Sequence, residues 1–418
     1  MRSLSDDAFI KFFQFYIRNS GICAKVLPEG NREQLGSILK NCSASYPAGF
    51  IPFFEKIIVS DEIPNAWATP ILEGILCHFL YRFGNLAPPK EWTPKSSLPD
   101  ATALAKIILS WLEPNPFLWE KIDRISDALN VCSSLPGAAD NAEPLLFCQY
   151  RLSSHEDPEE AENMEALTGE DLRHISCSTV RGKISESVIL LASNLLKKKT
   201  RLPPLLFPLL IRFATDPHPG VRVSILKHLP LFGQYDTEGA WKLFRAAFQH
   251  PHPQLWPYGE PFLWDQCNEH FDNIKHYLAR IRSEAFDTTA KTWGKVSALA
   301  CMLRHIPEDQ LINELIALDN QYAWQGVAEA FEVRITQKNN RDVVLLTANK
   351  FLSVIRNGQD VCQLEWFYDW LSELSDAAPY SAIQLYENLL SKADDPDLTF
   401  KVITMRNHLE MTYPIHNS

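Results

Sequence analysis

Residues 201–232 determine the expected fold and read RLPPLLFPLLIRFATDPHPGVRVSILKHLPLF. In the first half, apolar side chains recur at spacings of 1, 3, 1 and 3, at Leu205, Leu206, Leu209, Leu210 and Phe213. This spacing marks one face of a helix with a period of 3.6 residues. The second half repeats the stripe with Val221, Ile225, Leu229 and Phe232. The stretch therefore predicts two amphipathic helices that face each other.

A proline-rich turn, Asp216-Pro217-His218-Pro219-Gly220, separates the two helices. Proline lacks the backbone donor of a helix and restricts the preceding residue, so the first helix must end here. A helix, a D-P-x-P turn, a Val-Arg pair and a second amphipathic helix are together typical of a HEAT-type repeat. One such pair cannot bury its apolar face alone and must stack on neighbours. The predicted fold class is all-α, an α-solenoid of HEAT-like repeats.

Related turns recur along the chain, which supports a repeat architecture. His250-Pro251-His252-Pro253 lies 34 positions after the turn at 216–219, and looser echoes stand at 113–116 and 394–397. Helical patterns run from the aromatic stripe near residues 9–17 to the stretch 364–374 and beyond. We predict four segments: an N-terminal helical region of atypical repeats (1–152), an acidic loop (153–170), HEAT-like repeats (171–306) and C-terminal helical repeats (307–418).

Composition indicates a folded protein rather than a disordered one. The 418 residues are 46% hydrophobic, with a formal net charge of −11 and a pI near 5.6. The negative net charge disfavours a general nucleic-acid binder, but it does not exclude a local basic groove. Nine scattered cysteines have no zinc-binding spacing, and no apolar run reaches the ~18–20 residues of a membrane span. These features predict a cytoplasmic protein with reduced cysteines, no metal and no membrane association.

The densest negative charge lies in residues 153–171, SSHEDPEEAENMEALTGED. Eight acidic residues fall within sixteen positions there, without a lysine or arginine among them. Such a run is usually a solvated loop or an exposed helix face. The alternative is a docking surface for a basic partner. Nothing in the run suggests the perturbed carboxylate pair that acid–base catalysis needs.

Three motifs carry a resemblance to a known family: Val180-Arg181-Gly182, the run from Leu206 through Asp216 to Arg222, and Tyr235 through Phe244. The region 171–306 resembles the C-terminal helical-repeat region of large bacterial STAND-type NTPases, including antiviral ones. In that family a V-R-G helix start precedes a repeat with a D-P-x-P-x-V-R turn. The resemblance implies repeats that sense a partner or hold the NTPase inactive.

The chain departs from that family because it has no G-x-x-x-x-G-K-[ST] loop to hold phosphates. Gly182-Lys183 and Gly294-Lys295 lack both the upstream glycine and a following Ser or Thr. The sequence also has no G-x-S-x-G, H-E-x-x-H or dinucleotide-binding pattern. We therefore predict a repeat region split from its motor, or a related stand-alone scaffold, with no catalytic residue and no cofactor.

The candidate partner-binding residues are aromatic side chains and the two arginines of the Val-Arg pairs: Trp256, Tyr258, Phe262, Trp264, Arg181 and Arg222. The four aromatics crowd one proline-containing stretch. Exposed together, they would form a typical protein-binding patch, whereas buried they would form core between repeats. The alternative role of Arg222 is structural, because it would pair with Asp216 or cap the preceding helix.

Three functions therefore compete. The favoured one is a non-enzymatic scaffold or recognition module that binds a protein, in a bacterial defence or NTPase-linked system. The alternative is a HEAT-like nucleic-acid-binding protein or DNA glycosylase-like enzyme, and the third is an enzyme of another kind. The alternative needs a convergent basic groove, with charge from Arg181, Lys183, Lys197, Lys198, Lys199, Arg201, Arg212 and Arg222. The sequence makes no prediction of oligomeric state.

Overall fold

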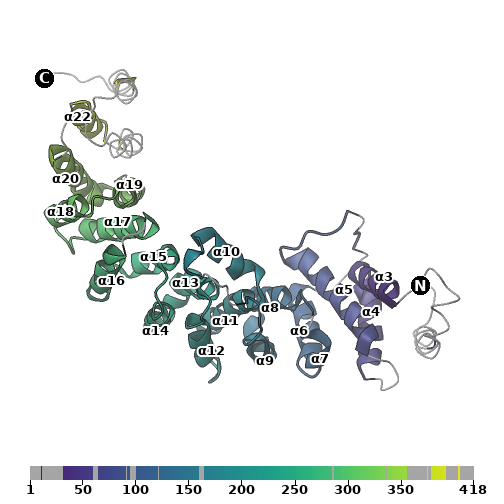
Figure 1. Ribbon diagram of the computed structural model, residues 1–418. Coiled ribbons are helices and arrows are strands. Elements are labelled where there is room, and N and C mark those ends of the chain that lie inside the picture. The colour runs from purple at the N-terminus through teal and green to yellow at the C-terminus, as the bar shows by residue number, and fades with distance from the viewer. Residues whose placement is uncertain are drawn as a thin grey trace. The chain divides into compact units, whose positions relative to one another are not determined.

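The fold is taken from a computed structural model of the chain. It describes residues 32–59, 65–90, 100–120, 122–159, 164–284, 287–335, 337–354 and 378–391, with positions 11, 92–94, 374 and 403–404. Every regular element in these ranges is a helix, which confirms the all-α prediction (Figure 1). No described helix is long and apolar enough to cross a bilayer. The helices predicted near 9–17 and 364–374 lie outside the described residues, apart from positions 11 and 374.

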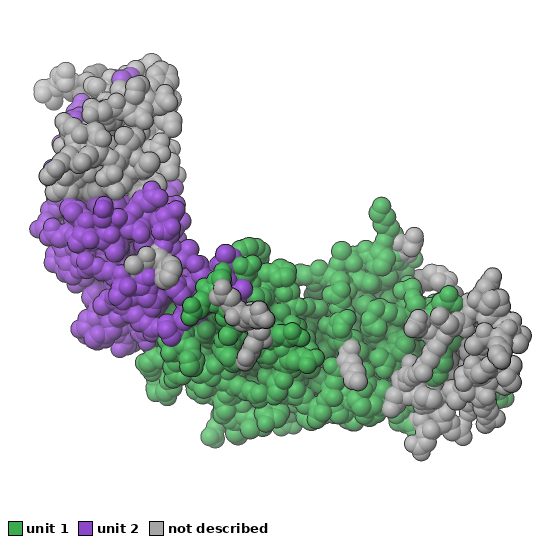
Figure 2. Space-filling model, in the orientation of Figure 1, with its two compact units in different colours: residues 1–166, 170–250 green, residues 167–169, 251–418 purple. Residues whose placement is uncertain are grey.

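The chain divides into two compact units, coloured separately in Figure 2. Unit 1 comprises residues 1–166 and 170–250, and unit 2 comprises 167–169 and 251–418. This division differs from the boundaries predicted at 152, 170 and 306. The acidic segment does not separate two domains, because the chain returns to unit 1 at Glu170.

In unit 1, several helices pack against the next helix but one along the chain, and these alternate helices form rows. Its helices are α3 (Arg32–Ser45), α4 (Pro47–Ile58), α5 (Asn65–Phe83), α6 (Ala101–Leu112), α7 (Pro116–Trp119), α8 (Ile125–Ser134), α9 (Ala142–Leu152), α10 (Gly169–Ser178, entering at Glu170), α11 (Val180–Lys197), α12 (Leu206–Ala214), α13 (Pro219–Gly233) and α14 (Thr237–Ala247), with short 3₁₀ turns η1 (Ala138–Asn141) and η2 (Met164–Ala166). In one row α11 packs between α8 and α13, and in another α12 packs on α14. The helices α9, α12 and α14 lie along the lower edge of unit 1 in Figure 1.

The stretch 201–232 folds as its pattern predicts, with one difference. It forms α12 and α13 on either side of the proline turn, and both apolar stripes are buried apart from Leu205. Leu205 precedes the first helical residue and is 59% exposed. The turn satisfies its own donors, because Asp216 Oδ1 accepts from His218 N at 2.9 Å and His218 Nδ1 accepts from Gly220 N at 3.1 Å.

Small polar side chains join neighbouring helices of the row α8–α11–α13. The hydroxyls of Ser133 and Ser187 lie 2.8 Å apart, and Gln149 Nε2 donates to both, at 3.0 Å and 2.8 Å. On the other side of α11, Ser224 Oγ donates to the carbonyl of Gly182 at 2.9 Å. Because buried polar groups need partners, these bonds select one register between the helices.

Glu186 gives this row a testable dependence on pH. Its carboxylate accepts from Asn130 Nδ2 and pairs with His228 Nε2, each at 2.8 Å. Burial opposes ionisation, but the bonds from His228 and Asn130 outweigh it and lower the pKa of Glu186 below its usual 4.5. The stabilisation is therefore present above pH 4.5 and is lost as pH falls through the folded-state pKa.

We expect Glu186→Gln to destabilise unit 1 by about 1 kcal/mol at neutral pH, because two charge-assisted bonds are weakened. The difference from wild type should shrink as pH falls below 4.5. Hydrogen exchange of α11 and α13 across a pH series measures this. A difference that stays constant across the series would contradict the assigned role of the ionised carboxylate.

Unit 2 repeats the arrangement of alternate helices. Its elements are η3 (Pro253–Leu255), α15 (Trp256–Gln266), α16 (Phe271–Ser283), α17 (Asp287–Met302), α18 (Glu308–Leu318), α19 (Gln321–Ile335), α20 (Lys338–Val354) and α22 (Pro379–Leu390). The helix α17 packs against both α15 and α19, and α20 packs against α18 and α22. At the α17–α19 crossing, a Cβ on Gly294 would lie 2.1 Å from the carbonyl oxygen of Ala323. Only glycine permits this approach of the two backbones.

Candidate functional site

The candidate site is a pocket of unit 1 with a volume of about 490 Å³. It forms where the segment after α9 passes beside the start of α11 and the end of α12. Most of its lining residues are of polar type, and the full lining comprises Ser153, Ser154, His155, Glu156, Pro158, Arg181, Arg212, Thr215, Asp216 and Pro217. The volume lies within the range of ligand-binding pockets, about 300–1,000 Å³.

An ion pair between Arg181 and Asp216 forms one wall of the pocket. Arg181 Nε lies 3.1 Å from Asp216 Oδ2, and Nη2 lies 3.4 Å from Oδ1. The side chains are only 11% and 8% exposed. Arg181 Nη1 also donates to the carbonyl of His155 at 2.7 Å. The arginine therefore fixes the segment after α9 against the turn at 216–219, and its charge is neutralised.

The first part of the acidic segment is ordered by helix capping. Asp157 Oδ2 accepts from the backbone N–H of Val180 at 2.7 Å, and the Asp157 carbonyl accepts from Arg181 N at 3.0 Å. The adjacent Thr179 Oγ1 accepts from Gly182 N at 3.3 Å. A carboxylate at the N-terminus of α11 also complements the helix dipole. The solvated-loop interpretation is thus wrong for Asp157, which is half-buried and has a structural role.

Arg212 borders the same pocket from the end of α12. Its side chain is exposed, with Nη1 donating to Ser153 Oγ at 3.0 Å and Nη2 to Ser154 Oγ at 2.7 Å. Within the described part of the chain it forms no ion pair. His155 Nδ1 accepts from the backbone N–H of Asp157 at 3.1 Å, which assigns the ring proton to Nε2. The pocket therefore presents a guanidinium, a hydroxyl and an imidazole N–H.

Two exposed aromatic side chains stand on the neighbouring outer helices. Phe117 on α7 is 58% exposed, and Tyr150 on α9 is 54% exposed. An ion pair between Arg151 and Glu120 joins the ends of these two helices. The carbonyl of Tyr150 accepts from Ser153 Oγ at 2.7 Å, so the backbone of Tyr150 adjoins the pocket. We call Phe117 and Tyr150 the aromatic patch.

The aromatic residues predicted to bind a partner lie in unit 2 and are mostly internal. Trp256 and Phe262 are fully buried, because α15 directs them into the core. Tyr258 donates its hydroxyl to the carbonyl of Gly169 at 2.6 Å and is half-buried, as is Trp264. Of the two alternatives for these four residues, burial in the core therefore holds for Trp256 and Phe262, which are corrected as partner-binding candidates. Only Tyr258 and Trp264 keep some exposed surface. Partner binding by these two residues stays a prediction.

The two predicted arginines lie in unit 1 and have structural partners. Arg222 is 2% exposed, and its Nη1 donates to the carbonyls of Ala247 at 2.9 Å and His250 at 2.6 Å. Burial lowers the pKa of the Arg222 guanidinium to about 10. It therefore caps the following helix, α14, rather than the preceding one. The ion pair expected between Arg222 and Asp216 is formed by Arg181 instead.

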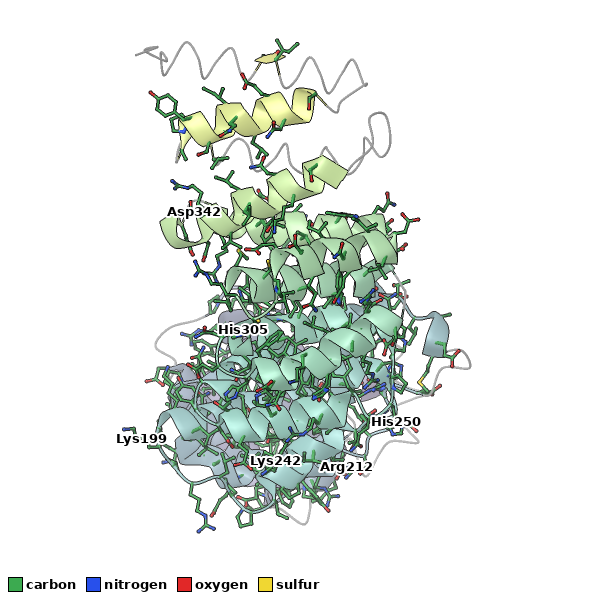
Figure 3. All side chains as sticks on the ribbon, turned by 90° about the vertical axis from the view of Figure 1, so that its left-hand side faces the viewer. Lys199, Arg212, Lys242, His250, His305 and Asp342 are labelled. Atoms are coloured by element: carbon green, nitrogen blue, oxygen red, sulfur yellow. The ribbon has the colours of Figure 1, made fainter. Side chains whose placement is uncertain are left out.

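The basic residues proposed for a nucleic-acid groove do not all converge, although Arg181 and Arg212 line the same pocket. Lys183 Nζ is paired with Asp127 at 2.7 Å, and Arg181 and Arg222 are bonded internally. Lys199 follows the C-terminus of α11, about 25 Å from Arg181 at 1.5 Å per residue. Figure 3 shows Lys199 and Arg212 on opposite sides of the view. These residues therefore do not all share one groove, and the alternative function stays a prediction.

Buried thiols and metal-ligating side chains offer no reactive centre among the residues that the structure describes. Burial raises the pKa of both Cys132 and Cys267 to about 12, so each stays a thiol near neutral pH. Within the same described ranges, no three His, Cys, Asp or Glu side chains cluster as metal ligands do. We therefore consider the pocket beside α9, with its several polar side chains, as the candidate site.

Sequence reasoning missed the aromatic patch and the serines of the pocket. Arg212 was noticed only as one of several basic residues. A signal was present, since Tyr150-Arg151-Leu152 ends an apolar helical pattern and is followed at once by Ser153-Ser154. That pattern indicates a helix end with an exposed aromatic residue, but it does not show which arginine lies opposite.

Comparisons with known proteins leave the family open. The chain matches no protein-family model, no curated protein and no solved structure. The resemblance to the repeats of STAND-type NTPases therefore stays a prediction based on its motifs.

Proposed function

We propose that the chain is a HEAT-like helical-repeat scaffold that binds a protein partner through the outer surface of unit 1. The observation that carries the proposal is a pocket adjoined by the backbone of Tyr150, with exposed Phe117 and Tyr150 on helices joined by the ion pair of Arg151 and Glu120. Exposed aromatic side chains next to polar, partly buried groups are the usual composition of a protein-binding hot spot. Extended helical-repeat proteins present such surfaces to protein ligands.

Two equivalent arginines support the repeat architecture. Arg181 and Arg222 each follow a valine at a helix start, and each reaches the first residue of a later proline turn. Arg181 contacts the side chain of Asp216, and Arg222 contacts the carbonyl of His250. An arginine at the same place in the motif thus reaches the same place in the next turn, through a carboxylate in one case and a carbonyl in the other, as expected when one unit is repeated along the chain.

The motif resemblance suggests a class of partner. In STAND-type NTPases such repeats belong to the same protein as the motor, whereas this sequence lacks the phosphate-binding loop. We therefore include in the proposal an NTPase or effector of a bacterial defence system as the partner.

Affinity capture of the tagged protein from its native cells tests the proposal. One sample is treated with nuclease and a parallel sample is not, and both are analysed by mass spectrometry. A stoichiometric protein that survives nuclease treatment is the expected result. Recovery of nucleic acid alone, with no protein retained after nuclease, would contradict the scaffold proposal.

We expect the double variant Phe117→Ser/Tyr150→Ser to reduce capture of that partner at least about 30-fold, because hot-spot aromatics contribute roughly 2 kcal/mol or more. The thermal midpoint should change little, since both side chains are largely exposed. Tyr380→Ser is the matched control, because Tyr380 is a 64% exposed aromatic residue of unit 2. Equal loss of capture in both variants would remove the aromatic patch from the proposal.

A further inference from the structure

The pocket beside α9 contains two guanidinium groups in different electrostatic states. Arg181 is neutralised by the bidentate contact with Asp216. Arg212 contacts only the hydroxyls of Ser153 and Ser154 among its described hydrogen-bond partners. Hydroxyl groups orient a guanidinium but do not cancel its charge. The fold therefore holds Arg212 in position and leaves its charge available to an anionic ligand.

Further donors lie next to Arg212. A guanidinium has five N–H donors, and those of Arg212 are only partly used by the two serines. Ser154 Oγ accepts from Arg212 and keeps its own O–H to donate, and His155 presents Nε2–H. These groups match the several acceptor lone pairs of a carboxylate or phosphoryl group.

The remaining charges of the lining set the strength of such a site. The charges of Arg181 and Asp216 cancel, which leaves Arg212 opposed by the carboxylate of Glu156. Glu156 is exposed, so water screens its repulsion of an anion. At about 490 Å³ the pocket is far larger than one ion and has room for a side chain of a bound segment.

We propose that this pocket binds an oxyanion carried by a segment of the partner protein, either a carboxylate or a phosphorylated side chain, with Arg212 as the main ligand. Ser154 and His155 donate to the same group, and the aromatic patch receives apolar residues of the same segment. The inference rests on the proposed scaffold function and names the chemistry of its partner.

Arginine side-chain NMR tests the pocket on the isolated full-length chain, with sodium phosphate and sodium acetate as probes at constant ionic strength in chloride. Loss of one Nε–H signal in Arg212→Gln assigns that signal, and Arg245→Gln assigns an exposed control on α14. We expect the Nε–H signal of Arg212 to shift with probe concentration until it saturates, and the Nε–H signal of Arg245 to stay unchanged. Stronger binding of phosphate identifies a phosphorylated source, and binding of acetate that is equal or stronger identifies a carboxylate.

Removing the opposing charge gives an independent check. Glu156→Gln should lower the half-saturating probe concentration by about twofold or more, because one exposed like charge is removed. A shift at Arg212 that never saturates, or that is no larger than at Arg245, overturns the oxyanion site.

Affinity capture with Arg212→Gln separates this inference from the scaffold proposal. We expect at least about a tenfold loss of the protein captured by wild type, as for a charge-assisted bidentate contact. If wild type captures a protein but the Arg212 signal does not shift with the probes, the oxyanion site is rejected and the scaffold proposal is kept. If the anion binds but no protein is captured, the partner protein is rejected as its source.

Discussion

Replacing Arg181 by methionine is expected to destabilise unit 1 by about 3–5 kcal/mol. The substitution leaves the Asp216 carboxylate, only 8% exposed, without its bidentate partner. It also removes the donor to the carbonyl of His155, which holds the wall of the pocket. A buried charge without a partner costs more than the ion pair itself contributes, so the effect should exceed that of an ordinary surface substitution.

Hydrogen exchange of α11 to α13 and urea unfolding measure this effect. The double variant Arg181→Met/Asp216→Asn should recover at least half of the loss, because it removes the unpaired charge and keeps an acceptor for His218 N. Arg245→Met, at an exposed site on α14, is the control and should be nearly neutral. A cost below about 1 kcal/mol for Arg181→Met would show that the pair behaves as a surface ion pair.

Gly294→Ala is expected to destabilise unit 2 by about 3 kcal/mol, the upper end for an overpacked core. The added Cβ would meet the carbonyl oxygen of Ala323 at 2.1 Å, and that backbone atom cannot move without separating α17 from α19. The contact is reciprocal, since a Cβ on Gly326 would lie 2.1 Å from the carbonyl oxygen of Lys291. Hydrogen exchange of α17 and α19 should therefore accelerate.

The matched control is Gly36→Ala in α3, where the nearest atom to a new Cβ is Pro70 Cγ at 3.5 Å. That change should be neutral or stabilising by about 0.5–1 kcal/mol, because alanine favours helix more than glycine does. Gly294→Ala and Gly326→Ala should be less than additive when combined, since either one opens the same crossing. Unchanged exchange in α17 and α19 would contradict the close-packing argument.

The sequence by itself determined the helical class and the ends of α12 and α13. These features depend on interactions within a few residues, namely the 3.6-residue apolar period and the prolines of the turn at 216–219. Even the exposure of Leu205 has a local cause, because Pro203-Pro204 delay the start of α12.

Only the tertiary structure decided which side chains are available to a partner. Trp256 and Trp264 belong to one aromatic run, yet one is fully buried and the other half-buried. The pocket brings Arg212 to Ser153, 59 positions earlier in the chain, and Arg181 to Asp216, 35 positions later. The physical reason is that pattern and propensity act over one or two helical turns, whereas burial and ion pairing depend on which helices pack together. The register of that packing is selected by contacts between distant residues, such as Gly294 with Ala323 and Ser133 with Ser187.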